Sequence, residues 1–518
     1  MSDEEKNINE VEETQEEIKE EPIQEEVVEE APAEEVQEEP AKEEAAPKKK
    51  KKLRWKDMTP EQKKKRRIRD IIISATVIGL VIVLFGIFAL AGYLGNNTNR
   101  EMIKNIEKVE TIYKMGDNLN IDEETGYYTF TVENDATFKV LQLTDIHIGG
   151  GAFSISKDNW ALNAVAKMVQ GVKPDLVIVT GDIGYPVPFQ AGTFNNKREA
   201  ETFAELMEQL GIYWAFAFGN HDTEAYSLYS REEIGEEVYL HKELYPHCLY
   251  QTGPADVDGY CNYIINVKNK LGIITQSFVM LDSHSYTDGD ILGIGWKYDN
   301  IHQNQVDWYK AEINKLNALN KTKFATLNDA QKLEFATAKV TDKCKKDSTI
   351  TEAQKAIMIA DELVSDNALY TTGMSIKSSL YFHIPLVEYK DAYDEYVDNN
   401  KANSGQHYEY LGGIAGETGK VVYCGMHEDN LFETIQEVKS TTHVFCGHDH
   451  LNNFAFKYWG KNGNKETDWG VVLSYGYSID YLAYAGIAKK YEQRGGTIIS
   501  IAPSGELSFQ KERLIDIA

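Results

Sequence analysis

Two histidines flank an aspartate in the segment THVFCGHDH, residues 442–450, directly after a short apolar run. Near pH 7 an imidazole is neutral or weakly basic, and it can offer a nitrogen to a metal ion. Taken alone, the pair fits a surface turn as well as it fits a metal site. The choice between these interpretations depends on whether the chain supplies further ligands.

Four other apolar runs end in polar residues of the same chemical kind, in the segments LQLTDIH, VIVTGD, FAFGNHD and SLYFHIP. The side chains that follow the five runs are those of Asp145, His147, Asp182, Asn220, His221, Asp222, His383, His448 and His450. An aspartate after a strand is often a turn residue or a helix cap. Because ligands of open α/β sheets gather outside the carboxyl ends of the strands, five such endings together predict one shared site.

The types of these side chains indicate the chemistry. Carboxylate, amide and imidazole ligands suit zinc, manganese or iron better than a thiolate site does. A bridging carboxylate can hold two such cations about 3.5–4 Å apart, and the pair can activate a water molecule and bind the oxygens of a tetrahedral anion. The sequence therefore predicts two divalent or mixed-valence metal ions (Zn, Mn or Fe) and a small phosphate ester as the substrate.

The elements that must position these residues alternate along the chain. Strand-like runs at 127–132, 137–145, 175–182 and 213–222 are separated by helical stretches at 157–170 and 197–210. This alternation predicts an α/β fold with a largely parallel sheet. A polar insertion at about 315–375 is predicted to be helical, and the C-terminus is predicted to form a hairpin that turns at Pro503-Ser504-Gly505. The chain has five cysteines but no C-x-x-C, so neither a zinc ribbon nor a thioredoxin-like motif is indicated.

The motifs D-x-H, G-D, G-N-H-D, H-I-P and G-H-D-H, in this order, resemble the calcineurin-like metallophosphoesterases over roughly residues 137–505. The segments FHIPLVEY and GHDHLNNF are similar to the branch of that family related to purple acid phosphatases. For the fold, the resemblance implies a four-layer α/β/β/α sandwich with a dinuclear metal site at one rim.

The resemblance also implies a role for each motif residue. Asp145, His147 and His450 would hold one metal ion, and Asn220, His383 and His448 would hold the other. Asp182 would bridge the two ions. His221 would donate a proton to the leaving oxygen or stabilise the phosphoryl group, and Asp222 would orient it.

Tyr185 is the point where two patterns compete. The segment GDIGY matches the purple acid phosphatases, in which the tyrosine binds ferric iron, but their first motif is D-x-G and this chain has His147 there. One metal ion should not need both ligands. We therefore expect His147 to coordinate, and Tyr185 to pack or to contact the substrate.

The charge changes sign sharply before the catalytic region. Residues 1–47 carry 20 acidic side chains and three lysines and are predicted to be a disordered acidic tail, whereas residues 48–70 form a basic juxtamembrane segment. Residues 71–94 contain no charged residue, and roughly 20 helical residues cross a bilayer, so a single transmembrane helix is predicted there. A cleaved signal peptide is the rival interpretation, because Ala89-Leu90-Ala91 resembles a cleavage site.

The basic block before the apolar stretch also predicts the topology. By the positive-inside rule the N-terminus is cytoplasmic. A stalk at 95–125 and the metallophosphoesterase domain at 126–518 then lie outside the cytoplasm, with the protein in the cell membrane. Residues 71–94 would contact the lipid bilayer, and the acidic tail would be a solvated spacer or, as a minor alternative, a docking site for a cytoplasmic protein.

These features together predict a membrane-anchored phosphoesterase. A phosphodiesterase or nucleotide hydrolase with the same site is one alternative, and a catalytically silent membrane scaffold is another. The residues after the basic block have a strong excess of acidic side chains, which disfavours nucleic acid as a partner.

Overall fold

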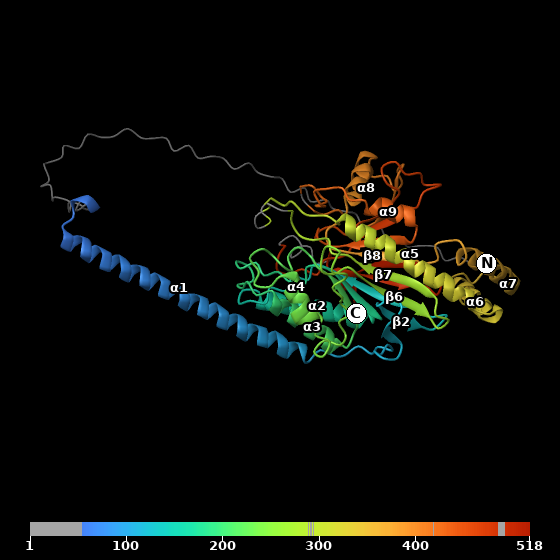
Figure 1. The fold of residues 1–518 in the computed structure, drawn as a ribbon, viewed down its shortest axis with the longest axis horizontal. Helices are drawn as coiled ribbons and strands as arrows, with labels where there is room; N and C mark the ends of the chain where they lie inside the picture. Colours follow the sequence, from blue (N-terminus) through green and yellow to red (C-terminus); the bar gives the residue numbers. More distant parts are fainter. Residues whose placement is uncertain are drawn as a thin grey trace, which may run out of the picture. The chain divides into compact units, whose positions relative to one another are not determined.

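Figure 1 shows a computed structural model of the 518-residue chain. The structure describes residues 54–517 apart from 288–289, 291–292, 294, 418 and 485–492. The acidic tail predicted at 1–47 and the first part of the basic segment, 48–53, lie outside the described residues. The chain divides into two units, residues 1–75 and 76–518, and the second contains all the predicted site residues.

Two mixed sheets form the centre of the larger unit. The nine-stranded sheet has the order β1 (Leu119–Ile121), β2 (Tyr128–Val132), β6 (Tyr263–Asn269), β7 (Ile274–Met280), β8 (Ser378–Tyr381), β10 (Thr441–Cys446), β12 (Val471–Tyr475), β11 (Ala455–Tyr458) and β9 (Tyr408–Gly412). The five-stranded sheet has the order β14 (Leu507–Arg513), β13 (Gly495–Ile501), β3 (Phe138–Leu143), β4 (Leu176–Thr180) and β5 (Trp214–Ala217). The predicted α/β class is confirmed, and so is the C-terminal hairpin, β13 with β14.

Helices cover the sheets, and two apolar clusters hold the layers together (Figure 1). The helices of the larger unit, besides α1, are α2 (Ile155–Val172), α3 (Lys197–Leu210), α4 (Arg231–Ile234) with a π-helical turn (Gly235–Tyr239), α5 (Gln303–Ala325), α6 (Asp329–Lys346), α7 (Glu352–Leu369), α8 (Val387–Asp398) and α9 (Leu431–Val438). One cluster joins the two sheets to α2 and α3, and Phe138 of β3 stacks on Phe278 of β7 with 6.1 Å between ring centroids. The other cluster lies between the nine-stranded sheet and α5, α8 and α9.

The central strands are apolar on both faces, as expected of parallel strands buried between layers. All residues of β4, LVIVT, and of β5, WAFA, are buried. β3, β4 and β5 are parallel neighbours, and β8, β10 and β12 are parallel neighbours in the other sheet. Each sheet therefore presents three carboxyl strand ends side by side.

Helix α1 spans Pro60–Ile103 and contains the predicted transmembrane stretch. It is long and apolar enough to cross a membrane, and its most apolar window is not buried by the protein. The first residues of the predicted stalk, 95–103, are part of this helix. α1 continues through them to Ile103, and Gly95, Asn96 and Asn99 are buried, because their small or polar side chains let the helix pack closely on α2 and α3.

The predicted helical insertion at 315–375 is occupied by the second half of α5 and by α6 and α7. Asn328 and Thr351 cap the last two of these helices, each in a reciprocal capping box with a glutamine three residues later.

All five cysteines are free thiols, so the domain is held together without a disulfide.

Candidate metal centre

The seven predicted metal ligands all lie just beyond the carboxyl ends of strands. Three strands of the five-stranded sheet precede Asp145, His147, Asp182 and Asn220, and two strands of the nine-stranded sheet precede His383, His448 and His450. The two sets meet because the sheets are bonded to each other at this edge. The Asp480 backbone N–H donates to the Asp145 carbonyl oxygen at 2.8 Å, and Gln142 Nε2 donates to the Cys446 carbonyl oxygen at 3.2 Å.

The backbone at these strand ends takes a conformation that is uncommon for residues with a side chain. The φ angles are 51° at Asp145, 56° at His147, 55° at Asp182 and 79° at His448. Left-handed residues of this kind persist where the surrounding structure holds them, and they cluster at functional sites. This backbone conformation directs the side chains away from the strand direction and toward one another.

Two glycines allow the loops to approach this closely. A Cβ at Gly219 would lie 2.1 Å from Asp182 Oδ1, and a Cβ at Gly447 would lie 1.9 Å from Thr144 Oγ1. Neither position has room for any side chain. The G-N-H-D and G-H-D-H motifs therefore need their glycines to bring the following residues against the strand ends of β3 and β4.

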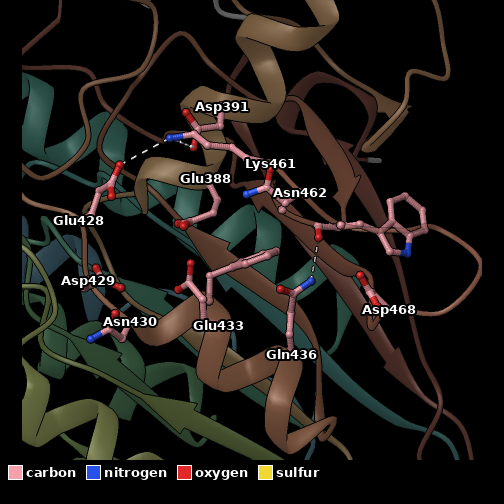
Figure 2. A pocket seen from close by; sticks show the side chains of 14 residues that line it. Glu388, Asp391, Glu428, Asp429, Asn430, Glu433, Gln436, Lys461, Asn462 and Asp468 are labelled. Atoms are coloured by element: carbon pink, nitrogen blue, oxygen red, sulfur yellow. Dashed lines mark hydrogen bonds and ion pairs between the residues drawn. The ribbon is translucent and has the colours of Figure 1, made fainter.

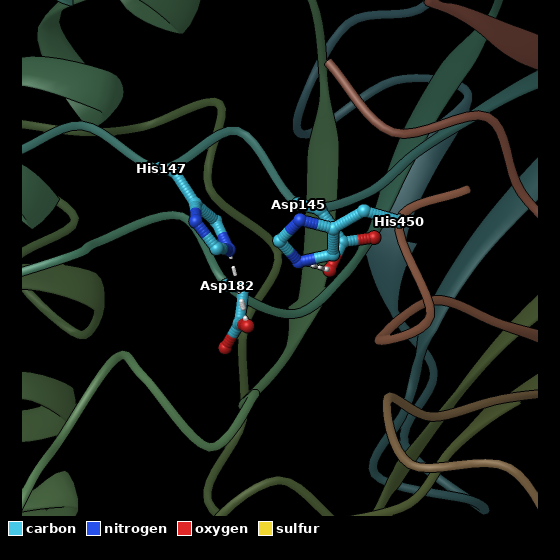
Figure 3. Close-up of side chains that lie close together, drawn as sticks. All are labelled: Asp145, His147, Asp182 and His450. Carbon is cyan, nitrogen blue, oxygen red and sulfur yellow. Dashed lines mark hydrogen bonds and ion pairs between the residues drawn. The ribbon is translucent and has the colours of Figure 1, made fainter. Parts of the chain in front are cut away.

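Asp145, His147, Asp182 and His450 form one buried cluster, in which one ligand atom from each residue lies within 4.8 Å of the others (Figure 3). His147 Nε2 lies 3.2 Å from Asp182 Oδ2, and His450 Nε2 lies 3.4 Å from Asp145 Oδ1. Oxygen and imidazole nitrogen atoms that converge in this way fit a metal ion of the zinc, manganese or iron type.

Asn220, His383 and His448 form a second group, which meets the first at Asp182. His383 Nε2 is 3.1 Å from Asp182 Oδ2 and 3.2 Å from Asn220 Oδ1. His448 Nδ1 is 3.3 Å from His383 Nε2. The same carboxylate oxygen of Asp182 thus contacts one imidazole from each group, as the bridging ligand of a metal pair requires.

The electrostatics of the cluster follow from its burial. Burial alone would raise the pKa of the Asp182 carboxyl, but the imidazoles of His383 and His221 outweigh it and hold that pKa well below its usual value. Burial would lower the pKa of His383, whereas the Asp182 carboxylate raises it to about 9. The Asp182 carboxyl is therefore ionised, as metal binding needs, and a metal ion that binds His383 would displace the proton that the raised pKa leaves on this imidazole.

Asp480 belongs to this centre and was not predicted from the sequence. Its carboxylate lies 3.8 Å from His147 Nδ1 and 3.5 Å from His450 Nδ1. Both nitrogens are buried, and within the described part of the chain Asp480 is the carboxylate that faces them. It also accepts hydrogen bonds from the N–H groups of residues 482–484. A carboxylate behind metal-binding imidazoles fixes their orientation. The sequence feature that could have indicated Asp480 is its place after a further apolar run, VVLSYGYSID. However, Asp480 follows the end of β12 by five residues, so it does not directly follow the strand as the predicted ligands do.

His221 is oriented by a residue other than the one expected. Its Nδ1 lies 2.6 Å from Glu224 Oε1. The Asp222 carboxylate turns inward and accepts the backbone N–H groups of Asp182, Gly184 and Gly219 at 3.0, 2.9 and 2.7 Å. The orienting contact assigned to Asp222 is therefore made by Glu224, because Asp222 is occupied in holding the loop that carries Asp182.

If the centre hydrolyses phosphate esters, as the motifs imply, replacing Glu224 by glutamine should lower the rate by about 10- to 100-fold, the usual effect of losing a carboxylate that orients a histidine. The loss should be greater for an alkyl phosphate than for p-nitrophenyl phosphate, because a poor leaving group depends more on a proton donor. Steady-state rates with both esters and the metal content measure this. Glu388→Gln, in a different cavity, is the matched control and should keep the parent rates. Equal losses for both esters would argue against this role.

Tyr185 stacks on His147 with 4.8 Å between ring centroids and an angle of 12° between the rings. Burial and the nearby Asp480 carboxylate raise the pKa of its phenol, which keeps the hydroxyl protonated. Tyr185 also lines the cavity of about 570 Å³ in front of the metal centre. The other lining residues include His221, Glu224, Tyr226, Tyr286, Trp296, Tyr298, Glu417, Tyr423, His448, His450 and Tyr484.

A second cavity of about 440 Å³ is strongly acidic and is lined by residues of α8, α9 and the segment after β11 (Figure 2). Burial and the Asp429 carboxylate raise the pKa of Glu388 there to about 8. Lys461 Nζ lies 3.1 Å from Asp391 and 3.5 Å from Glu428. Among the described residues that line it, none is a predicted metal ligand, so the candidate centre belongs to the other cavity.

Two mixed sheets with a buried aspartate and histidine cluster at their carboxyl edge are consistent with a metallophosphoesterase fold. A family model described as calcineurin-like phosphoesterase matches residues 138–340, a range that contains Asp145 to Asn220 but ends before the last three histidine ligands. Residues 138–340 thus match the calcineurin-like phosphoesterases, the family that the motifs of the chain indicated.

Curated proteins with similar sequences include plant proteins named as inactive purple acid phosphatases and a yeast phosphatase. "Probable inactive purple acid phosphatase 14" of Arabidopsis thaliana is 28% identical over 41% of this chain and 55% of its own length. "Probable inactive purple acid phosphatase 29" of the same plant is 23% identical over 70% of this chain and 76% of its own length. "Phosphatase DCR2" of Saccharomyces cerevisiae is 24% identical over 64% of this chain and 47% of its own length. The chain thus spans about half the length of the first and third of these relatives.

Proposed function

We propose that this protein is a membrane-anchored phosphoesterase that hydrolyses phosphate esters outside the cytoplasm at a dinuclear metal centre, on a four-layer α/β/β/α scaffold. The observation that carries the proposal is the position of Asp182, whose Oδ2 contacts both His147 Nε2 and His383 Nε2. A buried carboxylate shared between two sets of imidazole and oxygen ligands is the arrangement that binds a pair of cations.

Each ligand has an assigned place. Asp145, His147 and His450 would hold one ion, Asn220, His383 and His448 the other, and Asp182 both. Metal ions bound there supply Lewis-acid stabilisation of the phosphoryl oxygens and a water molecule of lowered pKa for attack on phosphorus. Asp480 holds the rings of His147 and His450 from behind, which keeps their Nε2 atoms toward the shared space.

His221 is the proton donor in this proposal. Burial would lower the pKa of its imidazole, but the carboxylates of Asp182 and Glu224 raise it above the usual value. Glu224 holds Nδ1, which leaves Nε2 as the nitrogen that faces the substrate. A protonated imidazole in the cavity wall can donate to the leaving oxygen as the ester bond breaks.

The names of the plant relatives support a second candidate, a catalytically silent metal-binding protein. The full chain should contain two metal ions and hydrolyse p-nitrophenyl phosphate or bis-p-nitrophenyl phosphate, and a chelator should abolish the activity until Zn, Mn or Fe is restored. The ratio of the two rates separates a phosphatase from a phosphodiesterase. Bound metal without hydrolysis of either ester would favour the silent protein.

Protease added to intact cells should degrade the catalytic domain and spare the acidic tail. The expectation rests on the basic side chains that precede the apolar stretch of α1, which favour a cytoplasmic N-terminus. Antibodies against the two ends of the chain measure which end survives. If the catalytic domain is protected until the cells are opened, the orientation is the reverse of the one proposed.

A further inference from the structure

The C-terminal turns of α1 are fixed to the loop that follows His147. A Cβ at Gly92 would lie 3.3 Å from the Ala152 backbone nitrogen, and Phe88 contacts Phe153 edge to face with 4.9 Å between ring centroids. Further along, Asn99 Nδ2 donates to the Ile155 carbonyl oxygen at 3.4 Å. All of these contacts lie within the larger unit, so the end of the apolar helix and the catalytic domain form one packed structure.

This packing sets the depth of the loop relative to a bilayer. About 20 helical residues span the hydrocarbon core, and counted from Ile71, the first residue of the uncharged stretch, they end at Leu90, two residues or about 3 Å after Phe88. If α1 crosses the membrane, a residue that contacts Phe88 lies at the level where the hydrocarbon core gives way to lipid headgroups. Arg198 lies over the ring of Tyr93 at 5.9 Å, and such aromatic and basic side chains are typical of that level.

Large apolar side chains are exposed around this loop. The group, called here the rim surface, consists of Phe153, Trp160, Phe189, Phe194 and Leu228. Phe189 is 92% exposed, and Phe153 and Trp160 are 50% and 55% exposed. The backbone joins its parts, because the Phe153 N–H donates to the Ala191 carbonyl oxygen and the Leu228 N–H to the Phe194 carbonyl oxygen, each at 3.0 Å. Exposed patches of this kind mark sites of interaction with proteins or membranes.

The rim surface adjoins the cavity of the metal centre. Val187, which lines the cavity, precedes Phe189 by two residues. Phe194 contacts Tyr226, a lining residue, with 6.3 Å between ring centroids, and Trp160 contacts Tyr481, close in sequence to the lining residue Ala483, at 5.9 Å. The exposed apolar groups therefore continue directly into the walls of the cavity.

We propose that the rim surface lies in the headgroup region of the bilayer that α1 crosses, and that the cavity thereby receives phosphate esters carried by membrane lipids. The proposal rests on the phosphoesterase function and on the membrane helix proposed above. The bilayer is the occupant because the surface includes Phe153, which contacts the apolar helix, and the segment of Phe189 is hydrogen-bonded to Phe153 through the Ala191 carbonyl oxygen. Its aromatic side chains, with an apolar body, suit the boundary between hydrocarbon and water.

Depth-dependent quenching tests the surface without reference to activity. The full chain carrying Phe189→Trp is placed in phosphatidylcholine vesicles that contain brominated lipid. The emission added by the new tryptophan should be quenched, whereas that of Ile357→Trp, at another exposed apolar site, on α7, should not. No extra quenching for Phe189→Trp would overturn the proposal, and a change in oligomeric state on its substitution would assign the surface to a second copy of the chain instead.

Hydrolysis in the same vesicles tests the substrate class. The parent chain should release phosphate from phosphatidic acid, and Phe153→Ser with Phe189→Ser should lower the ratio of this rate to that with p-nitrophenyl phosphate by about 10-fold or more, because two apolar contacts with the bilayer are lost. Ile357→Ser should keep the parent ratio. If the chain hydrolyses p-nitrophenyl phosphate but not phosphatidic acid, the proposal of a lipid substrate is wrong. Failure with both esters would count against the phosphoesterase function, while quenching still decides the position of the surface.

Discussion

Asp182→Asn should lose both metal ions and reduce hydrolysis by a factor of about 1,000 or more. Asp182 Oδ2 lies 3.2 Å from His147 Nε2 and 3.1 Å from His383 Nε2, so the substitution removes a negative charge from both halves of the centre at once. Metal ions stabilise the transition state by several kcal/mol, and about 1.4 kcal/mol corresponds to a tenfold change in rate.

The variant should nevertheless fold. Asp182 Oδ1 accepts the His221 N–H at 2.8 Å, and the oxygen of an asparagine side chain can keep that hydrogen bond. Metal content by elemental analysis and rates with a phosphomonoester measure the result, with thermal unfolding as the check on folding. Asp391→Asn, which lies in the separate acidic cavity, is the matched control and should retain two metal ions and the parent rate. Two bound metal ions and full activity in Asp182→Asn would rule out the bridging role.

His147→Ala should lose one of the two metal ions and lower hydrolysis by more than about 100-fold, beyond the usual effect of a residue that only orients a ligand. Tyr185→Phe should change the metal content little. His147 Nε2 faces Asp182, whereas Tyr185 packs its ring on His147 and keeps its proton because burial and Asp480 raise the pKa of the phenol.

The visible spectrum distinguishes the two ligands directly. A phenolate bound to ferric iron absorbs visible light, and an imidazole bound to zinc or manganese does not, so the purified protein should be colourless or should keep its spectrum in Tyr185→Phe. His443→Ala is a control for the loss of a histidine, since this residue lies within β10 and the ring packs on Phe445. If the protein is purple and Tyr185→Phe removes the colour, the metal ligand is Tyr185 instead of His147.

The sequence by itself determined the α/β class and the family, because both depend on local patterns. Apolar runs that end in Asp145, Asp182 or Asn220 are visible wherever they occur, since a buried parallel strand is apolar on both faces and its polar neighbours begin where burial ends. The order of the motifs along the chain then gave the resemblance to the calcineurin-like metallophosphoesterases. The resemblance also assigned to Asp222 the role of orienting His221, and the structure places Glu224 at that imidazole.

Only the tertiary structure decided which side chains meet. Glu224 rather than Asp222 contacts His221 because Asp222 is held by three backbone N–H groups from two loops. Asp480 reaches His147 and His450 because the segments that follow β12 and β3 are hydrogen-bonded to each other where the two sheets meet. The helix that follows the apolar stretch packs on the loop after His147 instead of forming a free stalk, since Gly92 and Gly95 permit a close approach that no local pattern specifies. Such contacts depend on how distant segments are packed, and packing is a property of the whole fold.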